Sequence, residues 1–203
     1  MTYLAAHPGT VASLLGQHVV LVGISLAIAL AIAFPLGLLA RRNARAAAGV
    51  FAVTSTIYTI PSLALLAILV TVIGLGPIAA TVALVAYAQM ILVRAIVAGL
   101  RGVDPALVDA ARGLGMTPRQ TLLRVELPAA LPVLLGGVRV VTVTLIALAT
   151  IAAWIDAGGL GVLIFDGITS NNPAKIVAGA VVSAALAIVA DAALRGAEHA
   201  VRR

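Results

Sequence analysis

Long apolar stretches separated by small groups of charged residues dominate the pattern of this chain. A charged side chain at the centre of a bilayer costs at least about 2.5–3.5 kcal/mol, so gaps between charges mark candidate membrane spans. The first gap covers residues 1–40 and ends at Arg41, Arg42 and Arg45. Taken along the whole chain, the gaps predict about five transmembrane helices, at 15–39, 49–73, 78–100, 129–153 and 175–194.

Two of these boundaries rest on local signals. The gap from 46 to 93 is long enough for two spans, and the segment 73–77, Ile-Gly-Leu-Gly-Pro, interrupts it with residues that favour a turn. The last gap is short, but Asp191 and Arg195 lie four residues apart and are expected to pair on one helix face. The fifth span is therefore extended to residue 194.

Composition supports a membrane protein. Of the 203 residues, 63% are hydrophobic and 10% are charged, and the mean hydropathy is +1.19. Soluble domains average roughly 45–50% apolar and about 25% charged residues, so a soluble enzyme, a disordered tail and a disulfide-stapled secreted module are excluded. With no cysteine, thiol catalysis and Cys-ligated metals are excluded as well. We expect an all-α, polytopic fold in which residues 1–203 form one transmembrane domain.

The basic residues indicate the orientation of the chain, because cytoplasmic segments of membrane proteins are enriched in Lys and Arg. Under the five-span prediction, one side carries most of the arginines and the other carries Lys175. The N-terminus is therefore expected outside and the C-terminus in the cytoplasm. We attribute the net charge of +6 to arginines that set the topology and contact lipid headgroups, and not to nucleic-acid binding. The arginines on the predicted cytoplasmic side are Arg41, Arg42, Arg45, Arg101, Arg112, Arg119, Arg124, Arg195, Arg202 and Arg203.

The segment 101–127 is the one substantial polar stretch, and its capping signals predict two short helices. Asp-Pro at 104–105 begins the first helix, and Gly-Leu-Gly at 113–115 ends it. Thr117 begins the second helix, with Gln120 at the capping-box position. One alternative is a DNA-binding helix-turn-helix, but the adjoining spans would hold it against the bilayer. Another is an inert loop, although a mere connection could be far shorter.

Within this segment the sequence resembles the EAA motif of bacterial ABC-importer permeases: E-A-A, three residues, G, nine residues, I, one residue, L-P. The spacing matches throughout, with Asp for Glu at the first position and Val for Ile at the later one. The resemblance implies the type I ABC importer permease fold. It also implies a cytoplasmic coupling helix that docks on an ATPase subunit. The residues that carry this expected coupling role are Asp109, Ala110, Ala111, Gly115, Val125, Leu127 and Pro128.

Two further stretches, 58–66 and 149–161, resemble permeases for glycine betaine, choline and related osmoprotectants. Permeases for methionine and other small solutes share the Gly-Gly-Leu-Gly at 158–161. A methionine-like amino acid or another small solute is therefore the alternative substrate. The resemblance implies alternating access for a small solute such as glycine betaine, choline or carnitine. The implied partners are a cytoplasmic ABC ATPase, an extracytoplasmic solute-binding protein, and a second permease, identical or a sister, in a bacterial plasma membrane.

The chain carries no motif for hydrolysis, because it has neither a Walker-type loop nor His-Glu-x-x-His. We therefore expect no enzyme activity and no cofactor in this subunit, with ATP used by its partner. Aromatic residues are 3% of the chain, which favours a binding protein as the source of selectivity. Polar residues within spans are candidates for the substrate path, although a hydroxyl can instead bond to its own helix. The path candidates are Tyr58, Pro61, Ser62, Gln89 and Thr142.

Two other classes of protein compete with the importer. A membrane scaffold would have the same composition and topology but gives no reason for the EAA spacing. A secondary transporter would need ionisable residues at mid-membrane, and the predicted spans have few apart from Arg139, which is expected to snorkel or pair near the cytoplasmic end.

Overall fold

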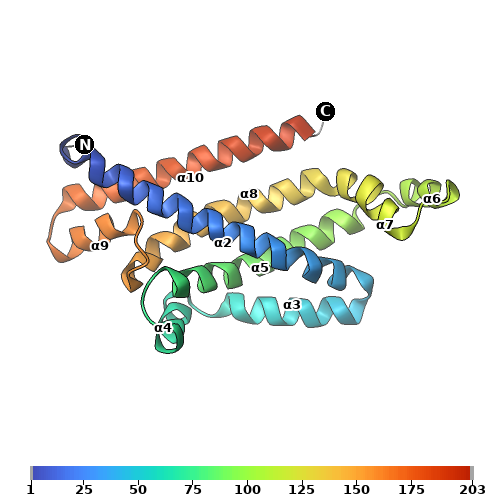
Figure 1. The fold of residues 1–203 in the computed structure, drawn as a ribbon, viewed down its shortest axis with the longest axis horizontal. Helices are drawn as coiled ribbons and strands as arrows, with labels where there is room; N and C mark the ends of the chain where they lie inside the picture. Colours follow the sequence, from blue (N-terminus) through green and yellow to red (C-terminus); the bar gives the residue numbers. More distant parts are fainter. Residues whose placement is uncertain (1, 202–203) are drawn as a thin grey trace.

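The structure, a computed structural model, describes residues 2–201, and all regular structure in that range is helical (Figure 1). Arg202 and Arg203, two of the arginines expected on the cytoplasmic side, lie outside the described residues. The long helices are α2 (Pro8–Arg42), α5 (Pro77–Arg101), α8 (Leu127–Ala152) and α10 (Pro173–Val201). The shorter elements are α1 (Thr2–Ala6), α3 (Ala44–Thr59), α4 (Ser62–Ile73), α6 (Pro105–Gly113), α7 (Pro118–Thr121), a π-helix η1 (Leu122–Glu126), a 3₁₀ turn η2 (Ala153–Ile155) and α9 (Gly161–Thr169).

Among the described residues, four continuous helical segments are long and apolar enough to cross a membrane. They contain the spans predicted at 15–39, 78–100, 129–153 and 175–194. The α7, η1 and α8 helices follow one another without a break from Pro118, so the fourth segment is much longer than predicted. The all-helical polytopic fold is thus confirmed.

The span predicted at 49–73 is not one straight helix. It is divided into α3 and α4, which are bent by 94° at the break. Pro61 stands at the N-cap of α4, and Ile60 before it is extended, with φ −67° and ψ 127°. A proline disfavours the helical conformation in the residue before it, which explains why the helix stops at Thr59. At Pro61 the chain therefore has a full break between two helices.

Small residues bring the long helices together. In the core formed by α2, α5 and α8, Gly37 lies against Ile96, and Gly137 lies against Ala95. Ala29 and Ala33 of α2 are fully buried. Membrane helices gain little from burying apolar surface, so close approach at small side chains supplies much of their packing energy. The result is a core of α2, α5 and α8, with α10 packed on α8 and α3 packed on α2 and α5 (Figure 1).

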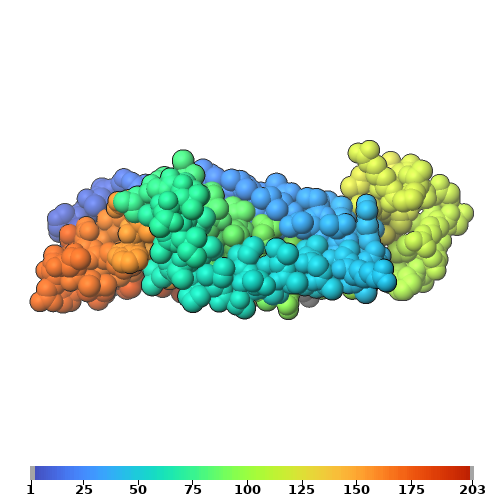
Figure 2. All heavy atoms as spheres, turned by 90° about the horizontal axis from the view of Figure 1, so that it is seen from below, coloured from blue at the N-terminus to red at the C-terminus, as the bar shows by residue number. Residues whose placement is uncertain are grey.

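The bundle has two different ends. At one end lie the N-terminus and α9, and we call it the α9 end (Figure 1). At the other end α6 and α7 extend beyond the bundle (Figure 2), and we call it the α6–α7 end. The α9 helix begins at Gly161, the last residue of the Gly-Gly-Leu-Gly segment. The two ends therefore place the polar segment 101–127 and the loop around 158–161 on opposite faces of the molecule.

Candidate functional site

Capping residues define the two helices of the polar segment as the sequence predicted. Asp104 Oδ1 accepts a hydrogen bond from the backbone N–H of Ala106 at 2.9 Å, and Pro105 is the first residue of α6. Thr117 Oγ1 accepts from the backbone N–H of Gln120 at 3.3 Å, while Gln120 Oε1 accepts from the backbone N–H of Thr117 at 2.8 Å. Gly115 has φ +78°, a left-handed conformation that favours glycine. The turn between α6 and α7 is thus fixed at both sides.

The segment joins α8 through a π-helical turn. The Leu127 N–H donates to the carbonyl of Leu122, five residues back, and Pro128 in the first turn of α8 has no N–H to donate. Because α7, η1 and α8 form one continuous helical segment, a displacement of α7 is transmitted directly into a membrane-spanning helix.

The residues of the EAA-like motif divide between an exposed and a packed set. Asp109 and Ala110 are exposed, and Asp109 pairs with Arg112 at 3.4 Å. Ala111 is buried. The remaining motif residues lie in the turn or at the α8 junction, where Val125 and Leu127 are partly buried, and Gly115 and Pro128 are exposed. Two large apolar side chains outside the motif, Leu107 and Leu114, are also exposed, at 50% and 80%.

An ion pair ties the segment to the first span. Arg41, in the last turn of α2, donates to the carboxylate of Glu126, which is almost completely buried. Arg101, the last residue of α5, donates to the carbonyl of Ala40 at 3.1 Å. The ends of α2 and α5 and the start of α8 are therefore bonded together. A cavity of about 120 Å³ lies beside this pair and is lined by Arg41, Arg112, Met116, Pro118, Thr121 and Glu126.

Three of the five predicted path residues lie together at the α3–α4 break. Tyr58 is exposed and meets the ring of Tyr87 edge-on, with centroids 5.7 Å apart. The Tyr87 hydroxyl donates to the carbonyl of Ile60, next to Pro61. Ser62 shares a small cavity with Tyr87. Sequence reasoning missed Tyr87, although a tyrosine inside a span of a chain with 3% aromatics was a usable signal.

The other two predicted path residues lie elsewhere and are used within the bundle. Gln89 Nε2 donates to the carbonyls of Val85 at 3.0 Å and Ala29 at 3.3 Å, which joins α5 to α2. The Thr142 hydroxyl donates to Val138 of its own helix at 2.7 Å. For Thr142 the alternative, a hydroxyl bonded within its helix, describes the structure. The five candidates therefore do not form one site within a single chain.

Two arginines lie inside the predicted spans, and sequence reasoning singled out one of them. Arg139 of α8 pairs with Asp191 at 3.0 Å and Glu198 at 3.2 Å on α10, as its expected pairing required. Arg94 of α5 was missed. Its side chain is exposed, and its guanidinium lies 3.4 Å from the Ser55 hydroxyl and 5.6 Å from the centre of the Phe51 ring.

The glycine-rich loop at the α9 end is held by two polar side chains of α2. His18 is fully buried; its Nε2 donates to the carbonyl of Ile146 at 3.1 Å, and its Nδ1 accepts from the N–H of Leu160 at 3.2 Å. Gln17 Oε1 accepts from the N–H of Gly159 at 3.1 Å. Gly159 has φ +80°, and a Cβ there would lie 2.9 Å from the His18 ring. The glycines of this loop thus allow close packing against α2.

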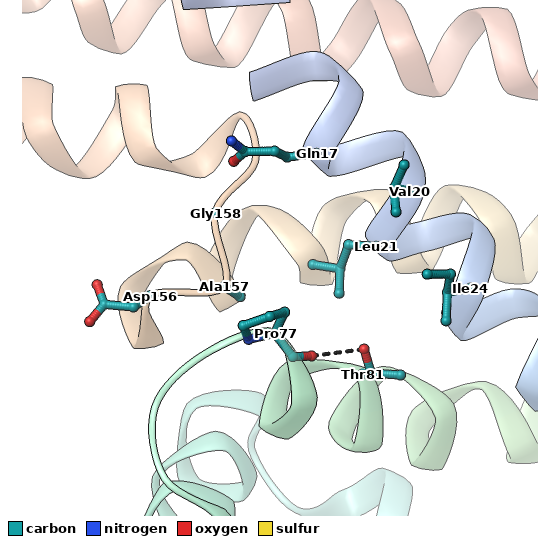
Figure 3. Close-up of a pocket in the computed structure, with 9 residues that line it drawn as sticks. All are labelled: Gln17, Val20, Leu21, Ile24, Pro77, Thr81, Asp156, Ala157 and Gly158. Atoms are coloured by element: carbon teal, nitrogen blue, oxygen red, sulfur yellow. Dashed lines mark hydrogen bonds between the residues drawn. The ribbon is translucent and has the colours of Figure 1, made fainter. Parts of the chain in front are cut away.

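An open pocket of about 380 Å³ lies beside this loop (Figure 3). Its walls are mainly apolar, and the Thr81 hydroxyl donates to the carbonyl of Pro77 at 2.8 Å. The pocket lies between the N-terminal part of α2, the start of α5 and the loop after η2. Its lining residues are Gln17, Val20, Leu21, Ile24, Pro77, Thr81, Asp156, Ala157 and Gly158.

These features define a helical membrane protein with a capped polar segment at one end of the bundle. Residues 19–203 match the protein family described as "Binding-protein-dependent transport system inner membrane component". The chain belongs to this family of membrane permeases. The family assignment confirms the predicted class, a transport subunit and not an enzyme, and favours it over the membrane-scaffold alternative. It also implies an ATPase partner, a solute-binding protein and a membrane location.

Curated relatives cover most of the chain. The carnitine transport permease protein OpuCB of Listeria monocytogenes is 38% identical over 90% of this chain and 84% of its own length. The glycine betaine/carnitine/choline transport system permease protein OpuCB of Bacillus subtilis is 35% identical over 99% and 93%. The osmoprotectant import permease protein OsmW of Salmonella typhimurium is 38% identical over 93% and 90%.

Solved structures share the fold. A permease chain of the MetNI methionine ABC transporter, in an inward-facing conformation, has a TM-score of 0.87 and 25% identity, and the match covers 96% of this chain and 97% of that one. A chain of an amino acid ABC transporter has a TM-score of 0.81 at 18% identity, which shows the shared fold alone. The predicted ABC importer permease fold is confirmed.

Proposed function

We propose that this chain is the permease of an importer for small osmoprotectants such as glycine betaine, carnitine and choline, which it translocates by alternating access. The observation that carries the proposal is the 35–38% identity, over 90% or more of the chain, to relatives named for these solutes. A methionine-like substrate is the second candidate, supported by the MetNI permease at 25% identity. The higher identity favours the osmoprotectants.

The test of substrate is uptake into proteoliposomes that contain this permease with its ATPase and binding protein. Radiolabelled glycine betaine, carnitine, choline and methionine are compared with and without enclosed ATP. We expect ATP-dependent uptake of at least one osmoprotectant and none of methionine. Uptake of methionine alone would replace the proposal with the second candidate.

We further propose that the segment formed by α6 and α7 docks on the ATPase at the cytoplasmic side. Three observations support this: the segment extends from the bundle (Figure 2), its apolar Leu107 and Leu114 are exposed beside Asp109, and it continues into α8 without a break. The Arg41–Glu126 pair would carry the same displacement to α2. Coupling then works through two spans, one reached along the helix and one across an ion pair.

The coupling proposal is tested by Gly115→Trp and Asp109→Lys. A bulky residue at φ +78° strains the turn that sets α6 against α7. The lysine reverses the charge on the exposed face. We expect both variants to reach the membrane and to lose ATP-driven uptake and co-purification of the ATPase. Arg45→Gln, an exposed change in the first turn of α3, is the control. Unchanged uptake in both variants would remove the docking role.

The proposed orientation places the α9 end outside the cell and the α6–α7 end inside. The clustering of arginines at the α6–α7 end supports it, because basic residues are retained on the cytoplasmic side. The chain has no cysteine, so single cysteines can be introduced without background labelling. We expect a membrane-impermeant maleimide to label Ser170→Cys in intact cells and Arg119→Cys only after lysis. The reverse pattern would invert the topology.

We propose that the functional unit contains a second permease, either identical or a sister chain. Within one chain, Gln89 and Thr142 are bonded inside the bundle, while Tyr58 lies on an exposed face. A solute path therefore needs another surface to enclose it. Crosslinking in membranes tests this proposal, and a strictly monomeric functional unit would overturn it.

A further inference from the structure

Arg94 presents a charge where a lipid-facing charge is very costly. Its guanidinium contacts Ser55, which lies eleven residues after Ala44, the start of α3. At 1.5 Å per residue this is about 16 Å along α3, and Arg94 lies seven residues, about 10 Å, before the end of α5 at Arg101. Both lengths place the guanidinium inside a hydrocarbon core about 30 Å thick. A charged group at that depth faces a water-filled path or a protein partner in preference to lipid.

The described part of the chain gives Arg94 no carboxylate within ion-pair distance. Its contacts are a hydroxyl, at 3.4 Å, and the face of the Phe51 ring. A second copy of this chain would not supply the missing anion from its spans, because Arg139 holds Asp191 and Glu198. In the same way, Arg41 holds Glu126. An anion that arrives from elsewhere fits this position.

Aromatic residues gather on the same face of the bundle. The chain has seven aromatic residues, and three of them lie between α3 and α5. Phe51 contacts Arg94, and Tyr58 contacts Tyr87. Tyr58 lies three residues after Ser55, so both are on one side of α3, about 5–6 Å apart at Cβ. An aromatic ring attracts a quaternary ammonium group, and a guanidinium binds a carboxylate. One group of each kind on this face matches the two charged ends of a small zwitterion.

We propose that Arg94 binds the carboxylate of a zwitterionic solute during translocation, while the exposed ring of Tyr58 contacts its quaternary ammonium group. The inference rests on the proposed function. It adds that the permease itself distinguishes solutes with a carboxylate from those without one. The buried Tyr87 holds the Tyr58 ring in place. The face formed by Phe51, Ser55, Tyr58 and Arg94 is open in one chain and becomes part of the path when a second permease covers it. Glycine betaine and carnitine have the carboxylate, whereas choline lacks it.

The test compares Arg94→Gln with wild type for three solutes in proteoliposomes. The binding protein is saturated with each solute, so that differences report the permease. We expect glycine betaine and carnitine uptake to fall at least about tenfold, and choline uptake to change by less than about threefold. Arg94→Lys keeps the charge without the forked geometry, so we expect an intermediate loss for the two zwitterions. Tyr58→Ala should reduce uptake of all three solutes.

Arg42→Gln is the matched control, because Arg42 is an exposed arginine at the end of α2 and its loss changes the net charge equally. We expect this variant to leave the ratio of the three uptake rates unchanged. An equal loss of all three solutes in Arg94→Gln, with the complex intact, would assign Arg94 to a subunit contact and overturn the inference. So would unchanged glycine betaine uptake.

The two proposals fail in different ways. If the wild-type complex imports none of the three solutes, the proposed function is wrong. If it imports choline but neither zwitterion, the proposed function stands, and the carboxylate role of Arg94 is refuted.

Discussion

The two arginines inside the predicted spans, Arg139 and Arg94, have opposite surroundings. Arg139 lies in the seam between α8 and α10, where two carboxylates hold its guanidinium at 3.0 and 3.2 Å. Arg94 lies on the open face between α3 and α5, where it meets a hydroxyl and an aromatic ring. The first charge is neutralised inside the chain, and the second is available to an anion from outside it.

The comparison shows that the role of a charged residue within a span depends on its surroundings. Burial of a charge is tolerated where an opposite charge and hydrogen bonds compensate its lost hydration, and such a site fastens two helices. A charge that stays exposed at mid-membrane depth points instead to a ligand or a partner. The acids that separate the two cases, Asp191 and Glu198, lie more than 50 residues from Arg139 along the chain.

The largest expected effect comes from removing both acids of the seam, in Asp191→Ala/Glu198→Ala. Arg139 would then remain half-buried without a carboxylate, and we expect the free energy of unfolding to fall by about 3 kcal/mol. Fluorescence of Trp154, the one tryptophan, reports unfolding by SDS in mixed micelles. Arg195→Gln, which loses an exposed pair, should cost about 0.5 kcal/mol and serves as the control. If the free energy of unfolding falls by no more than in the control, the ion pairs between α8 and α10 do not stabilise the fold.

A smaller effect is expected at the fastening near the α9 end, in His18→Leu. This change removes the acceptor of the buried Leu160 N–H and the bond to the Ile146 carbonyl. An unsatisfied buried N–H costs about 1–3 kcal/mol, so we expect about 2 kcal/mol in the same unfolding experiment. His7→Leu, at an exposed histidine, should leave stability nearly unchanged. If the two variants unfold alike, the His18 bonds do not hold the loop.

The smallest effect on stability is expected for Arg94→Gln. Its guanidinium has one long hydrogen bond and one ring contact at an exposed position, so the free energy of unfolding should change by no more than about 0.5 kcal/mol. A stable Arg94→Gln variant with an altered solute preference would separate the role of Arg94 most clearly from that of Arg139. A loss as large as that of Asp191→Ala/Glu198→Ala would contradict it, because Arg94 would then be a second fastening.

Local signals in the sequence predicted local structure well. The Asp104 cap, the Thr117–Gln120 capping box and the end of α6 near Gly115 all depend on residues a few positions apart. The helical spans and the polar segment were predicted for the same reason, because charge gaps and capping residues are local features of the sequence.

Features that depend on distant residues were not predicted. The Gln17 and His18 bonds to the glycine-rich loop join residues 142 apart, and neither partner indicates the other in the sequence. Arg94 was missed because an arginine near a span end is commonly a topology signal, and its depth becomes clear only from its contact with Ser55. A proline such as Pro61 signals an interrupted helix, but the size of the bend depends on where α4 packs.

The π-helical turn at Leu122–Glu126 sets the rotation of α8 about its axis relative to α7. A π turn holds more residues than an α turn, and each residue of an α-helix turns the chain by about 100° and advances it by 1.5 Å. Gaining or losing one residue in this turn would rotate all of α8 against α7 by that step, and Arg139 would carry α10 with it. Deleting one residue from 122–126 imposes the rotation permanently. Normal uptake by that variant would show that the angular setting of α8 does not matter for transport.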